Sequence, residues 1–122
     1  MKKLLFALLA ISGAAGNVSA EEAYIYPAGE MKVGQVVQLQ FPTVLYVNKK
    51  CGLPLADAAH MRLYKSYRGV WDVGCWARTI DGDAVIVVPK MPTKTVPLDA
   101  LVRADVQQDG TATIKALPSY GR

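Results

Sequence analysis

The sequence predicts a small, mainly β domain: an antiparallel barrel or sandwich with one short helix and one disulfide. Short runs of β-branched and aromatic residues recur along the chain, and residues typical of turns separate them. The chain also has only two cysteines, and both lie near its middle. About six or seven such runs in roughly 100 residues are typical of small antiparallel barrels and sandwiches.

Residues 1–20 have the layout of a bacterial secretory signal peptide. Two lysines precede an apolar run over residues 4–11, and small residues lead to Val18, Ser19 and Ala20, close to the A-x-A cleavage pattern. The apolar run is too short to span a bilayer. We therefore expect cleavage after Ala20, a periplasmic or secreted location, and no integral membrane segment in the mature chain. An uncleaved N-terminal anchor is the alternative.

Cleavage would leave a single domain, residues 21–122, in which residues 118–122 are expected to be a loose tail. The whole chain has 14 Lys and Arg against 10 Asp and Glu, and loss of the two N-terminal lysines would lower its net charge from +4 to +2. The remaining basic residues are scattered in the sequence, whereas nucleic-acid binding needs them clustered on one face. We therefore expect no nucleic-acid partner.

Cys51 and Cys75 are expected to form a disulfide, because export would place them in an oxidising compartment. Closing this loop would stabilise the fold by roughly 3 kcal/mol. A redox pair usually has the spacing C-x-x-C, and a zinc site needs three or four ligands. The single, distant His60 does not complete such a set, so we expect neither a metal nor another cofactor.

The strands expected before Cys51 are short. Residues 24–26 are either a short strand or a mobile lead-in. Residues 35–41 alternate between apolar residues and glutamines, as in a half-buried strand. Pro42 interrupts the ladder because it has no N–H to donate, and residues 43–47 resume it.

A short helix is expected near residues 54–62. Pro54 suits the first turn of a helix, and apolar residues then recur at helical spacing. Strands follow over residues 62–67 and 70–79, joined by a turn at residues 68–69.

A tight turn at residues 80–83 leads to the apolar strand 84–88, and it predicts a positive φ at Gly82. The unbroken apolar run indicates that both faces of this strand are covered. Residues 90–97 contain two prolines and are expected to be a loop. They are followed by a helical or 3-10 turn at residues 98–101.

The last two strands are expected over residues 102–106 and 111–116, because Asp109 and Gly110 between them form a hairpin signal. Taken with the earlier strands, this order favours an SH3-like barrel with a short inserted helix.

The best candidate for a binding surface is an aromatic and basic patch around Trp76 and Arg78, which share one face of the strand over residues 70–79. Trp, Tyr and Arg are enriched in binding hot spots. Tyr64 and Tyr67 on the preceding strand would extend the patch, although alternation places them on opposite faces unless a bulge intervenes.

The alternative is that Trp76 is a core residue, and the apolar strand 84–88 favours it because it suggests cover on both sides. Large aromatic side chains mainly supply core area. Trp71 shares the face of Cys75 and is expected in the core.

The sequence gives no positive support for catalysis. His60 has Asp57 three residues before it, but no nucleophile accompanies the pair. Asp81 and Asp83 are expected to serve the turn. We therefore expect an exported binding module with no catalytic residue, acting on a protein or a cell-envelope component. The alternative is a small secreted hydrolase that uses His60 with Asp57, or a carboxylate pair.

Overall fold

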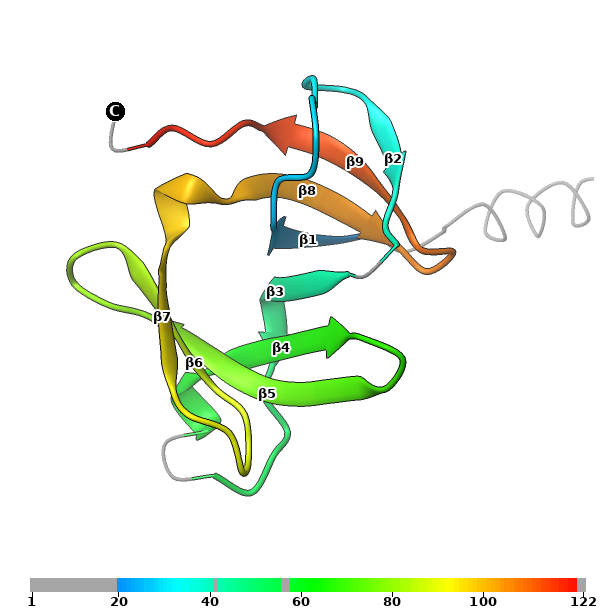
Figure 1. Ribbon diagram of the computed structural model, residues 1–122. Coiled ribbons are helices and arrows are strands. Elements are labelled where there is room, and N and C mark those ends of the chain that lie inside the picture. Colours follow the sequence, from blue (N-terminus) through cyan, green and yellow to red (C-terminus); the bar gives the residue numbers. More distant parts are fainter. Residues whose placement is uncertain (1–19, 41, 56–57, 121–122) are drawn as a thin grey trace, which may run out of the picture.

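The computed structural model describes residues 20–40, 42–55 and 58–120. The expected signal peptide, apart from Ala20, lies outside the described residues, and so does Asp57. Within them, nine strands form one antiparallel sheet in the order β2-β9-β8-β1-β3-β4-β5-β6-β7 (Figure 1). The strands are β1 (Ala20–Ile25), β2 (Val36–Gln38), β3 (Thr43–Lys50), β4 (Arg62–Tyr67), β5 (Trp71–Arg78), β6 (Asp83–Val87), β7 (Lys94–Pro97), β8 (Val102–Gln107) and β9 (Thr111–Ala116).

The mainly β fold and the single disulfide are confirmed, but the type of barrel is not. The ends of the strand order, β2 and β7, are the two edges of the sheet, so the sheet is not closed. In Figure 1, β1, β2, β8 and β9 form the upper part of the molecule and β4 to β7 form the lower part, with β3 between them.

The strand missed from the sequence is β7, which lies in the stretch expected to be a loop. It pairs with β6, and Pro97 lies opposite Asp83. Proline has no N–H for the ladder, and it is tolerated here because β7 has a neighbour on one side only.

The helix expected near residues 54–62 is reduced to the 3-10 helix η1 (Ala58–His60). Its backbone bonds, from Ala58 N to Leu55 O and from Met61 N to Ala58 O, have the i to i−3 pattern of a 3-10 turn. Cys51 N donates to Met61 O, which brings the two ends of this connection together. The second 3-10 helix, η2 (Leu98–Ala100), lies where a helical turn was expected. No helix among the described residues is long and apolar enough to cross a membrane.

The sheet buries a hydrophobic core on each of its two faces, because successive side chains of a strand point to opposite sides. In β1, Tyr24 belongs to the first core, whereas Ala23 and Ile25 belong to the second. The first core lies with β3 to β6 and η2, and its members include Leu45, Tyr64, Trp76, Ile86, Leu98 and Leu101. The second lies with β1, β8 and β9, and includes Val44, Val102, Ala104, Val106, Ala112 and Ile114.

The disulfide Cys51–Cys75 has a smaller cluster around it. The two Cα atoms are 5.4 Å apart, and Cys75 is fully buried. Ala58, Leu53, Leu55 and Met61 pack with the pair. The bond therefore connects the chain just after β3 to the centre of β5.

Two glycines have conformations or contacts that other residues would not accept. Gly82 has a φ of +86°, as the tight turn predicts. A Cβ atom on Gly74 would lie 2.4 Å from the carbonyl oxygen of Val87 and 2.8 Å from a methyl carbon of Val88. Strands β5 and β6 therefore approach each other too closely at Gly74 for a side chain.

Replacement of Cys75 by serine should lower the free energy of unfolding by roughly 2–5 kcal/mol, the usual cost of losing a native disulfide from a small domain. Chemical denaturation of the oxidised protein and of Cys75→Ser would measure this difference. Cys51→Ser should match it, because both variants remove the same bond. Equal melting temperatures with and without reductant would contradict the prediction.

Gly74→Ala should destabilise the protein by about 1–3 kcal/mol, the usual cost of overpacking. The Val87 carbonyl cannot retreat from the new methyl group without weakening the pairing of β5 with β6. Gly52→Ala is the matched control, because a Cβ atom there meets nothing within 4 Å. Similar losses in thermal denaturation of the two variants would show that close approach is not the cause.

Candidate functional site

Trp76 and Tyr64 are core residues and not members of a surface patch. Their exposed fractions are 4% and 2%. Trp76 Nε1 donates to the carbonyl oxygen of Tyr46 at 2.9 Å, which satisfies its polar atom. Its ring packs edge to face on Tyr24 with the centroids 5.9 Å apart. The core interpretation of Trp76 is confirmed.

Trp71 was expected in the core, and this is wrong, since half of its surface is exposed. The alternation of β5 does put Trp71 on the face of Cys75, but the cluster around the disulfide does not extend to the end of the hairpin. Trp71 packs there with Tyr67, at a centroid distance of 5.1 Å, and with the Lys65 ammonium, 4.6 Å from its ring. Tyr67 therefore lies on the opposite face of the sheet from Trp76.

Arg78 is exposed, and it contacts the aromatic floor formed by Tyr24. Its Nη2 atom donates to the Tyr24 hydroxyl at 2.8 Å. The guanidinium carbon of Arg103, on the neighbouring strand β8, lies 5.2 Å from the centroid of the same ring. Two guanidinium groups from different strands thus lie against one tyrosine side chain.

These residues belong to a cleft of about 410 Å³, which we call the arginine cleft. Its polar lining consists of His60, Arg62, Arg78, Arg103 and the hydroxyl end of Tyr24. The apolar lining residues are Val47, Trp76 and Ala77. Arg62 on β4 lies directly opposite Trp76 on β5. Strands β4, β5 and β8 therefore each contribute one arginine to the cleft.

The charge of the arginine cleft is only partly compensated. No carboxylate is among the described residues that line it. Arg103 forms an ion pair with Glu22, which lies outside the lining, and its Nε atom is buried with no hydrogen-bond partner in the described part of the chain. Arg62 and Arg78 have no ion pair with any described residue. Their charges are therefore available to a ligand.

A second hollow shares the side chains of Tyr24, Arg78 and Arg103 with the arginine cleft, but the part of its lining that is not shared is acidic. There the lining includes three carboxylates, those of Asp81, Asp83 and Asp99. An anion would consequently prefer the side on which Arg62 lies.

The geometry around His60 does not assemble a hydrolytic site among the described residues. His60 lines the arginine cleft, where the described lining has no carboxylate and no serine, threonine or cysteine. Asp57 lies outside the described residues. Asp81 and Asp83 are in the turn before β6, where Asp83 N donates to Thr79 Oγ1 at 3.1 Å. No three described His, Cys, Asp or Glu residues are grouped to hold a metal ion.

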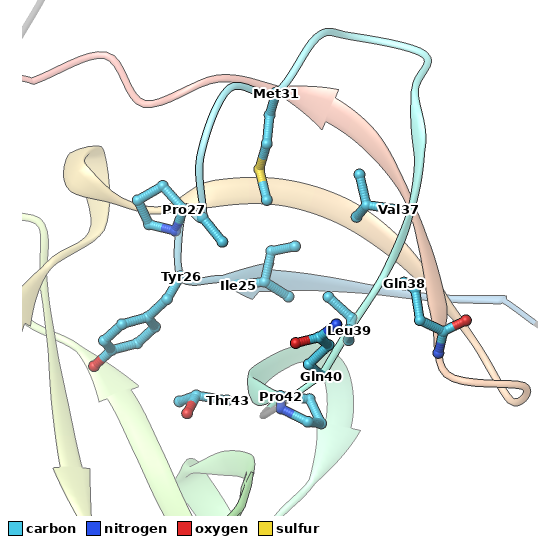
Figure 2. A pocket seen from close by; sticks show the side chains of 11 residues that line it. Ile25, Tyr26, Pro27, Met31, Val37, Gln38, Leu39, Gln40, Pro42 and Thr43 are labelled. Atoms are coloured by element: carbon cyan, nitrogen blue, oxygen red, sulfur yellow. The ribbon is translucent and has the colours of Figure 1, made fainter.

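An apolar groove of about 370 Å³ opens beside the second core (Figure 2). Figure 2 shows Met31 and Val37 on opposite sides of it, with Ile25 below them. Burial raises the pKa of the Tyr26 phenol above its usual value, and the positive charge of Lys94 opposes part of that rise. The described lining carries no charged side chain, so the groove offers contact area without charge-based selectivity.

Tyr24, Arg62 and Arg103 belong to the site but were not predicted as site residues. The position of Arg62 beside Trp76 could have been predicted from the sequence, because the two strands were expected to form a hairpin with a short turn. The pairing of Tyr24 with Arg103 joins residues far apart in the chain, and no local pattern indicates it.

No protein-family model, no curated protein and no solved structure matches the chain.

Proposed function

We propose that the protein is an exported binding module without catalytic activity, which contacts a protein or a cell-envelope component through the arginine cleft. The observation that supports this proposal is the presence of Arg62, Arg78 and Arg103 at one concave surface with no described carboxylate in its lining. Arginine is enriched in binding hot spots, and clefts lined by charge of one sign concentrate ligands of the other. The complementary group on the partner is therefore acidic.

The scaffold favours recognition by a rigid surface. The cleft residues lie on or next to strands, and its floor is made of Tyr24 and Trp76, two members of the first core. The disulfide connects the chain between β3 and η1 to strand β5, which carries both Trp76 and Arg78. A surface that is already ordered loses little conformational entropy when it binds.

Of the four residues predicted for binding, Arg78 alone is proposed to contact the partner. Trp76 lines the cleft from the core, Tyr64 is buried in the same core, and Tyr67 lies on the other face of the sheet. The contribution of Trp76 is therefore structural: it shapes the surface that presents Arg78.

Arg78→Glu should reduce capture of the partner from envelope extract at least about tenfold, because it reverses a charge at the centre of the proposed contact. Capture would be compared between the parent protein as exported, Arg78→Glu and Lys32→Glu. Lys32 is the matched control, since it is exposed, lies in the connection before β2, and undergoes the same change of charge.

All three proteins must first show the same melting temperature. Equal capture by Arg78→Glu and the parent, or equal losses in the two variants, would contradict the proposed surface. Elution of the partner at raised salt is also expected, because ions screen exposed charge pairs.

A further inference from the structure

We infer that the arginine cleft binds a phosphate group with a terminal, doubly charged oxyanion: a phosphomonoester or inorganic phosphate. The inference rests on the proposed function, because it names the chemical group that the same cleft takes from its partner. It depends on the number, position and existing partners of the cationic groups at the cleft.

The charge at the arginine cleft favours a phosphate. Arg62, Arg78 and Arg103 line the cleft, and the ion pair of Arg103 with Glu22 offsets one of their three charges. The Glu22 carboxylate also lies near a second cation, because its Oε2 atom is 3.9 Å from Lys115 Nζ. Neither Arg62 nor Arg78 forms an ion pair with a described residue, so two guanidinium charges remain without a direct carboxylate partner. A phosphate monoester carries about −1.5 to −2 charge at neutral pH, which matches them.

The number of strands that supply the donors also favours a phosphate. A planar carboxylate has two oxygens, and a single arginine satisfies both of them in a bidentate pair. Here the arginines come from β4, β5 and β8 and line the cleft from different strands. Donors supplied by three strands suit a tetrahedral group with three terminal oxygens, which can accept from each of them.

Contacts with Tyr24 hold two of the arginines in place. Arg78 donates one N–H to the Tyr24 hydroxyl, and Arg103 lies over the ring of the same residue. Each guanidinium has five N–H donors, so Arg78 keeps most of its donors for a ligand. Tyr24 is buried and packs on Trp76, which limits how far the Arg78 side chain moves in the absence of a ligand.

The neighbouring hollow determines on which side of the cleft the phosphate lies. The neighbouring hollow shares Tyr24, Arg78 and Arg103, but Asp81, Asp83 and Asp99 line its far side. These carboxylates would repel a doubly charged anion. The phosphate is therefore placed between Arg62 and Arg78, on the side of the cleft away from the three carboxylates.

Titration calorimetry of the protein as exported tests the inference, with glycerol 3-phosphate, inorganic phosphate and acetate as probes at one ionic strength set with chloride. Both phosphates should bind, and acetate should bind at least about tenfold more weakly. Arg62→Gln and Arg78→Gln should each raise the Kd for phosphate roughly tenfold or more, because each removes charge-assisted hydrogen bonds.

Arg68→Gln is the matched control. Arg68 is exposed, but it lies at the turn between β4 and β5 and is paired with Asp72 at 2.8 Å. Its loss should leave the Kd for phosphate unchanged. All variants must melt like the parent protein, and Arg103 is left intact because its buried Nε atom and its ion pair with Glu22 give it a structural role as well.

Three results would overturn the inference: no phosphate binding by the parent protein, equal affinity for acetate and phosphate, or an unchanged Kd in both cleft variants. None of these results by itself removes the proposed function, which fails if capture of the partner is insensitive to Arg78→Glu. An acidic partner that is captured through Arg78 without phosphate binding would indicate recognition of carboxylates.

A further arm identifies the source of the phosphate. Phosphatidylcholine vesicles doped with phosphatidic acid present a phosphomonoester on a lipid surface, and plain phosphatidylcholine vesicles are the blank. Binding to the doped vesicles that Arg78→Gln weakens would assign the group to a lipid headgroup. Binding to glycerol 3-phosphate alone, with the same dependence on Arg78, would assign it to a soluble ester and would equally support the site.

Discussion

The contact between Tyr24 and Trp76 is the interaction on which both the fold and the candidate site depend. The two rings meet edge to face at 5.9 Å, and both residues are buried in the first core. They also form the floor of the arginine cleft, where the Tyr24 hydroxyl accepts a hydrogen bond from Arg78. Because one pair of side chains serves both purposes, the packing that stabilises this half of the sheet also determines where the guanidinium groups lie. The candidate site is consequently built directly on core residues and not on a separate loop.

The sheet is able to support two cores because its central strands are buried on both faces. Ile25 and Val44 face the second core, whereas their neighbours Tyr24 and Leu45 face the first. Each core needs its own cover: the strands from β3 to β6 and η2 enclose the first, and the connection around Met31 together with β2 packs on the second. This arrangement lets about 100 residues bury two sets of apolar side chains with one continuous hydrogen-bond ladder. It also leaves two edges, β2 and β7, in place of a closed barrel.

The charge distribution at the arginine cleft is more consistent with recognition than with stability. Placing like charges around one aromatic side chain costs free energy, and burying the Arg103 Nε atom without a partner adds to that cost. Ion pairs elsewhere in the described residues include those of Arg68 with Asp72 and of Lys115 with Asp105. Local departures from the rules that stabilise a fold concentrate at functional sites. The cleft is the clearest such departure, and an anionic ligand would relieve it.

The local features of this protein could be predicted from its amino-acid sequence. Alternation and turn residues predicted most strands, β4 and β9 with their observed limits, and the Asp-Gly turn predicted the positive φ of Gly82. It also indicated the disulfide and the place of Arg78 beside Trp76 on β5. The burial of individual side chains on each face of the sheet depends on the tertiary structure. Trp71 is half exposed although it shares a face with the buried Cys75, whereas Trp76 is buried on the opposite face. The same holds for Tyr24 and Arg103, which reach Arg78 through strand pairing between distant segments. Side-chain alternation is a property of a few consecutive residues. Burial and charge clustering depend instead on which distant strand lies alongside, and on where the strands next to that strand end.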